Sequence, residues 1–495
     1  MDSLMIDVGP WAEQQFGSCD LGDQRRTKRL VKLAEKIAAK PDASTPGQTQ
    51  RWADCKAAYR LMDCEDVTFA SIIAPHCELT RARTVGRWLL IDDTTEISIP
   101  IWRDVPGLGP VGDGGGQGFL LHTAMMVSAD TEELVGIAAQ ELFLRKPRKD
   151  KKESSAQRKH RPRESEVWSR VIDDVGTAPP GVEWIHVCDR GADNIEVFAH
   201  ALAQGHGWVI RASHLLRSVR AVDPRSPDDP TTGRRMPLQG LLAALAVCGE
   251  YDLEVRANKD QPARTARVEV RFGSLWMPRP QHVSPWTREH APQFIHTNVV
   301  EVIERHPPKG IKALRWVLYT SLPVASFDDA WQVVGYYEKR PLVEEYHKSL
   351  KTGCRVEKRQ YATAKRLRRI IAVLSITAVR LVQLKTVARV EPDRPAMEVV
   401  PRDWVETLVE HRKSQGRTIR PPDTTSVPRA KTANHAHRVQ RSGPTVREFF
   451  RHLAMLGGFL GRKRDGEPGW IAIWRGLTDL LRLVEGYRLA KKKCG

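Results

Sequence analysis

Carboxylates at the ends of apolar segments are the first residues in this sequence that suggest chemistry. The segment WLLIDD carries Asp92 and Asp93 at the end of one apolar run, and WIHVCD carries Asp189 at the end of another. In open α/β sheets ligands gather at strand ends, so carboxylates placed there can share a metal site. The alternative is structural, because aspartate after a strand is also a common helix cap or turn former. These two segments alone leave both interpretations open.

A third group of polar residues lies far downstream, at Tyr337, Arg340, Glu344 and Lys351. On a single helix at 100° per residue, these offsets place the four side chains within about 60° of one another. Acid and base on one stripe suit a site that holds a cation and a phosphate, whereas the plainer alternative is a solvated face with incidental salt bridges. Pro341 disfavours a helical Arg340 and favours a new helix that begins there, in which Glu344 and Lys351 still share a face.

The composition points to a polyanionic partner. The chain of 495 residues carries 78 Lys and Arg against 60 Asp and Glu, a formal charge of +18. Nucleic acid is the leading candidate for such a partner. No apolar run approaches the roughly 20 residues of a spanning helix, and the N-terminus lacks a basic and then apolar signal, so we expect a soluble, intracellular protein with no membrane partner. The eight cysteines include no Cys-x-x-Cys pair, which favours reduced thiols over a zinc site.

The first 80 residues are predicted to form a small, basic helical domain that binds DNA ends. The segment LGDQRRTKRLVKLAEKIAAK has apolar residues at helical spacing, with Asp23 as a candidate N-cap. Arg25, Arg26 and Arg29 would then lie in the first turns, where they oppose the helix macrodipole. That local cost suggests an external phosphate, although a solvated basic face is the commoner explanation of such a run.

The rest of the chain is predicted to be an α/β core followed by a helical domain. Five apolar runs from residue 86 onward read as strands and precede helical stretches after 189 and 326, which argues for a mixed sheet with covering helices. Residues 213–325 look like an inserted β-rich subdomain, which divides the core into 81–212 and 326–386. Residues 145–164 form a basic loop suited to phosphate contact.

Residues 387–495 are predicted to contain a polar linker at 413–444 and a last pair of helices. Trp474, Leu477 and Leu481 lie on one apolar stripe of the final helix. The stripe either joins two monomers or packs on the core of its own chain.

The segment YEKRPLVEEYHKSLKTG, together with IDDTT and VCDRGAD upstream, resembles the DDE transposases of the insertion-sequence-four family, most closely the Tn-five type. The resemblance spans nearly the whole chain and includes LGDQRRTKRLV, RESEVW, WVIRASH, LRWVLYTSLPV and LGGFLGRKRDG. The spacing of Tyr, two residues, Arg, three residues, Glu, six residues and Lys is the signature of that family. It is kept here from Tyr337 to Lys351.

The resemblance implies a ribonuclease-H-like catalytic core whose catalytic and metal-binding acids are Asp93, Asp189 and Glu344. It assigns Asp93 rather than Asp92 because Asp93 precedes the Thr-Thr pair. The expected cofactor is two Mg²⁺ ions, for which Mn²⁺ can substitute, because hard cations take carboxylate oxygens. Three acids hold two metals well only when a substrate phosphate contributes, so we expect metal loading to depend on DNA.

The resemblance also assigns residues that contact DNA. Tyr337, Arg340 and Lys351 belong to the signature, Arg211 matches a phosphate-contacting arginine, and Trp316 matches a tryptophan that receives a flipped base. Arg163, which opens the RESEVW motif, is a further expected DNA contact.

One departure from the family pattern concerns base stacking. Pro341 stands where the closest relatives carry a second tryptophan, so part of the stacking surface is missing in this chain.

The function implied by the resemblance is cut-and-paste DNA transposition. Such an enzyme binds terminal inverted repeats, cleaves them through a hairpin intermediate, and joins the 3′-OH ends to target DNA as a homodimer. It would act in the bacterial cytoplasm, associated with the nucleoid through DNA. The alternatives are a non-catalytic regulator that occupies transposon ends and a nuclease without strand transfer. The residues themselves support metal-assisted phosphoryl transfer, and the order of events comes from the resemblance.

Overall fold

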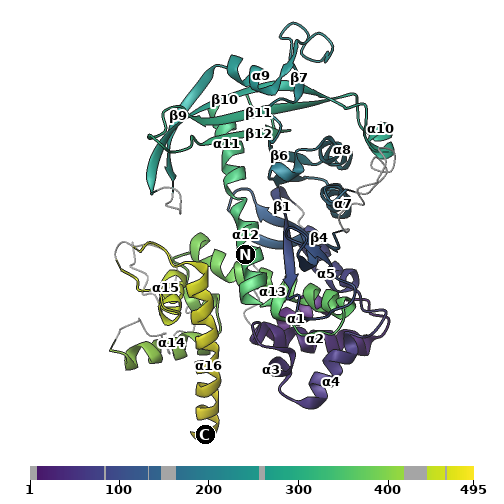
Figure 1. The fold of residues 1–495 in the computed structure, drawn as a ribbon. Coiled ribbons are helices and arrows are strands. Elements are labelled where there is room, and N and C mark those ends of the chain that lie inside the picture. The colour runs from purple at the N-terminus through teal and green to yellow at the C-terminus, as the bar shows by residue number, and fades with distance from the viewer. Residues whose placement is uncertain are drawn as a thin grey trace.

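The computed structural model describes residues 8–82, 85–131, 133–145, 163–255, 262–416, 443–462 and 465–494. The described strands form one 12-stranded mixed sheet, and helices gather toward both ends of the chain (Figure 1). This is the mixed α/β architecture that the sequence predicts.

The N-terminal region is helical, as expected. Its helices are α1 (Val8–Phe16), α2 (Gln24–Ala39), α3 (Thr45–Thr49), α4 (Trp52–Leu61) and α5 (Phe69–Arg81). The Asp23 carboxylate caps α2 by accepting the backbone N–H of Arg25 at 2.8 Å. Leu30, Leu33 and Ile37 form the buried face of this helix. The predicted cap and apolar stripe are therefore both confirmed.

The first part of the sheet is built by the five predicted apolar runs and one short additional strand. Its elements are β1 (Gly86–Ile99), β2 (Gly109–Val111), β3 (Gly116–Ser128), β4 (Leu134–Phe143), α7 (Glu166–Val175), β5 (Val182–Cys188), η1 (Arg190–Ala192), α8 (Ile195–Gln204) and β6 (Gly207–Arg211). Strand β1 is antiparallel to β3 and parallel to β5, which is parallel to β6. Helices α7 and α8 pack on one face of these strands (Figure 1).

The predicted β-rich insertion extends this sheet instead of forming a separate one. Its elements are β7 (Ser218–Ala221), β8 (Arg235–Pro237), α9 (Leu238–Ala244), β9 (Val247–Val255), β10 (Arg264–Pro278), α10 (Pro285–His290), β11 (Phe294–Glu304) and β12 (Arg315–Thr320). Strand β12 pairs antiparallel with β6, with Leu318 opposite Arg211. The sheet therefore runs in the order β2-β3-β1-β5-β6-β12-β11-β10-β7-β8.

The chain then returns to helix across the other face of the sheet. The elements are α11 (Phe327–Glu338), α12 (Pro341–Lys348), η2 (Ser349–Gly353), η3 (Val356–Lys358) and α13 (Ala364–Val390). Pro341 occupies the first turn of α12, as the sequence predicts, and η2 is a π turn in which the N–H of Cys354 bonds to the carbonyl of Ser349. The signature residues therefore do not share one continuous helix, because the path breaks before Pro341 and changes its helical period after Lys348.

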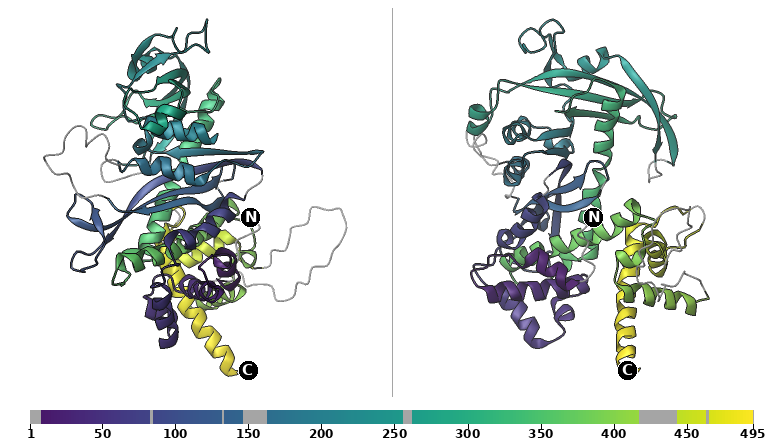
Figure 2. Two further views of the ribbon diagram at one scale, coloured as in Figure 1. Left: turned by 90° about the vertical axis from the view of Figure 1, so that its right-hand side faces the viewer. Right: turned by 180° about the vertical axis from the view of Figure 1, so that it is seen from behind.

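Two buried arginines fasten the N-terminal helices to the second half of the core. Arg359 donates to the carbonyl oxygens of Pro41 and Ala43, and Arg369 donates to those of Met62 and Val67. Figures 1 and 2 show these N-terminal helices, in purple, beside α13. A buried guanidinium that satisfies several carbonyl oxygens fixes both orientation and register.

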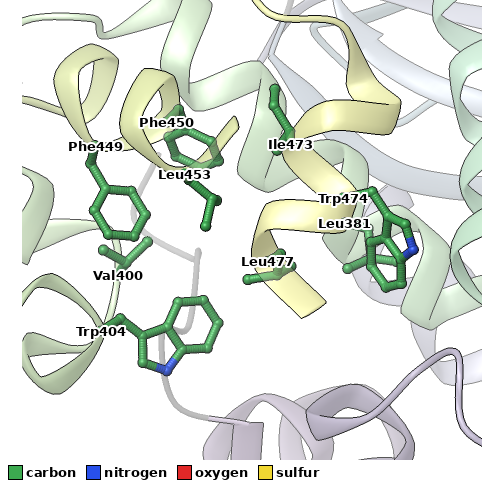
Figure 3. A pocket seen from close by; sticks show the side chains of 9 residues that line it. All are labelled: Leu381, Val400, Trp404, Phe449, Phe450, Leu453, Ile473, Trp474 and Leu477. Atoms are coloured by element: carbon green, nitrogen blue, oxygen red, sulfur yellow. The ribbon is translucent and has the colours of Figure 1, made fainter. Parts of the chain in front are cut away.

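The C-terminal region contains η4 (Ala396–Glu398), α14 (Arg402–Ser414), α15 (Val446–Leu456) and α16 (Trp470–Cys494), and the C-terminal end of α16 projects away from the other helices (Figure 2). Trp474 and Leu477 of α16 are buried within the chain, where they meet Trp404, Phe450 and Leu381 of other helices (Figure 3). The cavity left among these side chains is only about 10 Å³, so the packing is close. The prediction that this stripe joins two monomers is therefore wrong for Trp474 and Leu477, and the alternative, packing on the chain's own core, holds.

Two simpler expectations concern the cysteines and the membrane. The cysteines that the structure describes are free thiols, as expected. Within the described ranges, no helix is both long enough and apolar enough to cross a bilayer. Residues 417–442, most of the predicted linker, and residues 146–162, most of the predicted basic loop, lie outside the described residues.

Candidate active site

Asp93 and Asp189 lie side by side on neighbouring parallel strands. Asp92 of β1 is in register with Cys188 of β5, so the next residue along each strand is a candidate acid. Asp189 directly follows β5, and its Oδ1 accepts the N–H of Gly191 at 2.7 Å. It is thus both a turn former and a member of the acidic pair.

Asp93 does not end its strand, which corrects one expectation from the sequence. Strand β1 continues to Ile99 because β3 pairs with it along that whole length, with Asp93 opposite Thr123. The parallel partner β5 stops at Cys188, so Asp93 lies where β1 loses its neighbour on that side. The missing neighbour leaves room for a helix to approach.

Helix α12 brings the third acid and a shared cation to this point. One Nη of Arg340 lies 3.3 Å from Asp93 Oδ1 and 3.5 Å from Asp189 Oδ2, and the other lies 2.8 Å from Glu344 Oε1. The guanidinium therefore contacts all three predicted catalytic acids. In the part of the chain that the structure describes, no group of three or more Asp, Glu, His or Cys side chains has a geometry that could hold a metal ion.

The electrostatics of this cluster follow from burial and from mutual charge. Burial raises the pKa of Asp93 to about 6, a shift that Arg340 opposes and Asp189 reinforces. Burial alone would lower the pKa of Arg340, but the charges of Asp93 and Asp189 raise it. The charge of Arg340 therefore favours the ionised form of Asp93 in this half-buried setting.

A histidine that sequence reasoning missed also contacts the cluster. His347 lies one turn after Glu344, and its Nδ1 is 3.8 Å from Asp93 Oδ2. Burial, together with the charges of Lys351 and Arg340, lowers the pKa of His347 to about 3, so the imidazole is neutral. Its three-residue spacing from Glu344 was the signal available in the sequence.

Asp92 faces the opposite side of the sheet and belongs to a buried hydrogen-bonded chain. His206 Nε2 donates to the Gly176 carbonyl at 2.8 Å, which leaves its Nδ1 to accept from His186 Nε2 at 3.0 Å. Burial lowers the pKa of His206 to about 3, consistent with this neutral form. His186 Nδ1 then meets Asp92 Oδ2 at 2.8 Å, so one proton must be shared between those two groups. Asp92 thus has a structural role, which supports the choice of Asp93 for the site.

A large cavity is lined in part by Arg190, the residue that follows Asp189. It measures about 650 Å³, and its lining includes Arg190, Arg211, Lys312 and Trp316. The Trp316 ring lies 6.2 Å from that of Tyr337, at an angle of 55°. This volume is typical of a ligand site, and a basic lining with an aromatic face suits a nucleotide.

The other residues that the resemblance singles out around the site lie in different surroundings. Tyr337 is buried at the end of α11, and Pro341 is exposed at the start of α12. Lys351 lies in the π turn, close enough to His347 for its charge to act there. Arg211 donates through one Nη to the carbonyl of Arg315 at 3.2 Å.

The expected DNA-binding arginines of the N-terminal region all have acidic partners within that region. Arg25 pairs with Asp23 at 2.9 Å, Arg26 pairs with Asp66, and Arg29 lies 3.6 Å from Asp54. The phosphate contacts expected of these residues stay predictions.

Arg163 is exposed just before α7, at the edge of the described residues. Its expected contact with DNA also stays a prediction.

Comparison with known protein families gives two matches, one near each end of the chain. Residues 9–67 match the family model described as Transposase DNA-binding, and residues 422–494 match the one described as Transposase Tn5 dimerisation domain. These matches support a DNA transposase of the Tn5 type. They also support DNA and a second copy of the chain as partners. The acidic cluster belongs to neither matched range, so its assignment depends on the geometry above.

Proposed function

We propose that this protein is a cut-and-paste DNA transposase of the insertion-sequence-four family, with a ribonuclease-H-like core and catalytic acids Asp93, Asp189 and Glu344. The observation that carries the proposal is the convergence of these acids, from two strands and a helix, on one guanidinium. The flanking DNA-binding and dimerisation matches supply the biological setting.

The donor chemistry of the cluster fits the two Mg²⁺ ions that this reaction needs. Carboxylate oxygens are the ligands that hard cations prefer, and Asp93, Asp189 and Glu344 offer them on rigid elements. When bound, such ions activate a water or a 3′-OH and neutralise the leaving oxyanion. Mn²⁺ is expected to substitute.

The chain's own residues bind and orient the DNA strand. Arg340 can grip a phosphate through its planar fork, and Lys351 adds a point charge from the π turn. Arg211 and Arg190 line the adjacent cavity and would hold the flanking phosphates. The cavity beside Trp316 can receive an unstacked base, which a sharply bent strand requires. Exposed Pro341 offers no aromatic face there, so Trp316 stacks without the second tryptophan found in relatives.

The same site would serve successive displacements at phosphorus. Water cleaves the first strand and leaves a 3′-OH; this hydroxyl attacks the opposite strand, releases the flanking DNA and closes a hairpin. Water reopens the hairpin, and the 3′-OH then attacks target DNA. Each step exchanges one phosphodiester P–O bond for another or hydrolyses it, so no external energy source is required.

The remaining parts of the chain would select and pair the DNA ends. The N-terminal helices read the terminal repeat, while the basic loop at 145–164 contacts phosphate without regard to sequence. Because Trp474 and Leu477 are buried, dimer contacts in the C-terminal region would use its exposed apolar residues, among them Leu460, Ile471 and Leu489.

The test is an assay with labelled transposon-end DNA, in Mg²⁺ and in chelator, followed by addition of target DNA. We expect nicks, hairpins and joined products with Mg²⁺ and binding alone with chelator. Binding without cutting under all conditions would support the regulator instead. Cutting without joining would support a nuclease that lacks strand transfer.

A further inference from the structure

Arg340 combines features that a simple phosphate-binding residue does not need. It is the common partner of Asp93, Asp189 and Glu344, and its side chain is only 16% exposed. Ion pairs in such a half-buried setting are much stronger than in water. An arginine also stays charged at any physiological pH, so deprotonation of Arg340 cannot separate these pairs. A competing cation or a competing anion can.

We propose that Arg340 is an internal counter-ion that occupies the three carboxylates until a DNA phosphate takes its guanidinium, so that metal binding is coupled to DNA binding. This inference rests on the proposed function. A divalent cation must bind to the same oxygens that Arg340 contacts, and it meets the repulsion of a fixed positive charge there. A phosphate presents the same forked arrangement of oxygens as a carboxylate, so the guanidinium can exchange one partner for the other.

A second observation indicates how the exchange can begin. The Nε of Arg340 is buried and has no hydrogen-bond partner among the described residues. An unsatisfied buried donor is costly, so it favours an incoming acceptor. A phosphate oxygen reaches Nε only when the side chain turns toward the strand, and the hydrogen bond gained there favours the exchange of partners. Arg190 and Arg211 line the neighbouring cavity and attract the strand toward this point.

The experiment measures Mn²⁺ affinity of the full-length protein by electron paramagnetic resonance, with and without transposon-end DNA. The decisive variant is Arg340→Gln. Arg170→Gln is the matched control, because Arg170 of α7 pairs with Glu141 and forms no ion pair with the three acids in the described part of the chain. We expect Arg340→Gln to bind Mn²⁺ at least about tenfold more tightly than wild type without DNA, and Arg170→Gln to change affinity by less than about twofold.

End DNA should raise the Mn²⁺ affinity of the wild type more than that of Arg340→Gln. Wild-type affinity for Mn²⁺ should rise at least about tenfold with end DNA, whereas Arg340→Gln should gain much less, because its carboxylates are already released. If Arg340→Gln does not fold by circular dichroism, Arg340→Lys keeps the charge but loses the fork, and it should show an intermediate DNA-free affinity. Unchanged or weaker Mn²⁺ binding in a folded Arg340 variant would overturn the proposal.

A parallel cleavage assay on wild type separates this inference from the proposed function. If the wild type cleaves end DNA but substitution of Arg340 leaves the Mn²⁺ affinity unchanged, the counter-ion role is rejected and the transposase function still stands. If Asp93→Asn and Glu344→Gln leave the Mn²⁺ affinity unchanged and the wild type never cuts DNA, the site itself is rejected.

Discussion

In the middle of β1, adjacent aspartates on the two faces of the sheet have opposite surroundings. Asp92 is buried in a chain of hydrogen bonds that passes through His186 and His206 and ends on a backbone carbonyl. Asp93 instead pairs with Arg340, whose side chain is long and has many rotatable bonds. It also lies 3.8 Å from the neutral imidazole of His347. The first arrangement engages Asp92 through Oδ2 with His186 and so joins two strands, while Asp92 Oδ1 has no partner among the described residues. The second keeps charge in excess, three acids to one guanidinium, and so retains capacity for a ligand.

The difference shows how one strand separates support from chemistry. Because side chains alternate across a strand, neighbouring residues face different layers without any loop or hinge. On one face of the sheet, the hydrogen bond between Asp92 and His186 fixes β1 against β5. This contact also fixes the spacing of Asp93 and Asp189 on the other face. Substitutions at the two positions should therefore separate stability from activity.

The largest expected effect is on DNA cleavage, from substitutions on the face of the sheet that carries Asp93. Asp93→Ala should reduce cleavage of end DNA at least about a thousandfold, since it removes a metal ligand worth several kcal/mol in the transition state. Binding to end DNA, measured by gel shift, should stay near wild type, and Asp189→Ala and Glu344→Ala should behave alike. Near-normal cutting by any of these variants would remove that residue from the site.

A smaller effect, on local stability, is expected from substitution on the face of the sheet that carries Asp92. Asp92→Ala leaves His186 Nδ1 without its partner and should lower local stability by about 1–3 kcal/mol. A chain of this size does not unfold in one step, so hydrogen exchange of β1 and β5 peptides is the appropriate measurement. Asp93→Ala is the control and should leave exchange nearly unchanged. Unchanged exchange with lost cleavage in Asp92→Ala would instead make Asp92 the catalytic acid.

The smallest expected effect tests the same alternation on β12. Trp316 packs toward the face that carries the acids, while Val317 is buried on the other face. Trp316→Ala should slow hairpin formation about tenfold relative to nicking, because stacking on an aromatic ring returns roughly 1–3 kcal/mol and Pro341 offers no second ring. An abasic site at the flipped position should partly rescue the variant in a gel assay of single turnovers.

Val317→Ala provides the matched control for that measurement. It should loosen β12 without changing the ratio of hairpinning to nicking. Equal loss of both steps in Trp316→Ala, with no abasic rescue, would make Trp316 a structural residue.

Local features of the fold could be predicted from the sequence, and long-range ones could not. The Asp23 cap and the helix start at Pro341 depend on a few neighbouring residues, so their patterns were sufficient. The pairing of β12 with β6 depends on residues about a hundred positions apart, which no local pattern records. The stripe through Trp474 predicted burial correctly, but amphipathicity does not tell whether the covering surface belongs to the same chain.

The candidate site shows the same limit. The family signature predicted which acids form the site, and strand alternation explains why Asp93 and not Asp92 faces α12. The meeting of Arg340 with all three acids depends on where two strands and a helix finally pack. The position of Asp93 within β1 was likewise set by the length of β3, which lies elsewhere in the chain.

The order of the acids along the chain has a consequence for synthesis on the ribosome. Asp93 and Asp189 emerge first, and the whole β-rich insertion follows before Glu344 and Arg340 are made. At 5–20 residues per second, roughly 8–30 seconds separate the second acid from the third. Strand β12 must also reach β6 before α12 can settle over the acids. A nascent chain therefore completes the segment that matches the DNA-binding model long before the three acids can meet. Under the proposed function, products of premature termination within the insertion should bind DNA and leave it uncut.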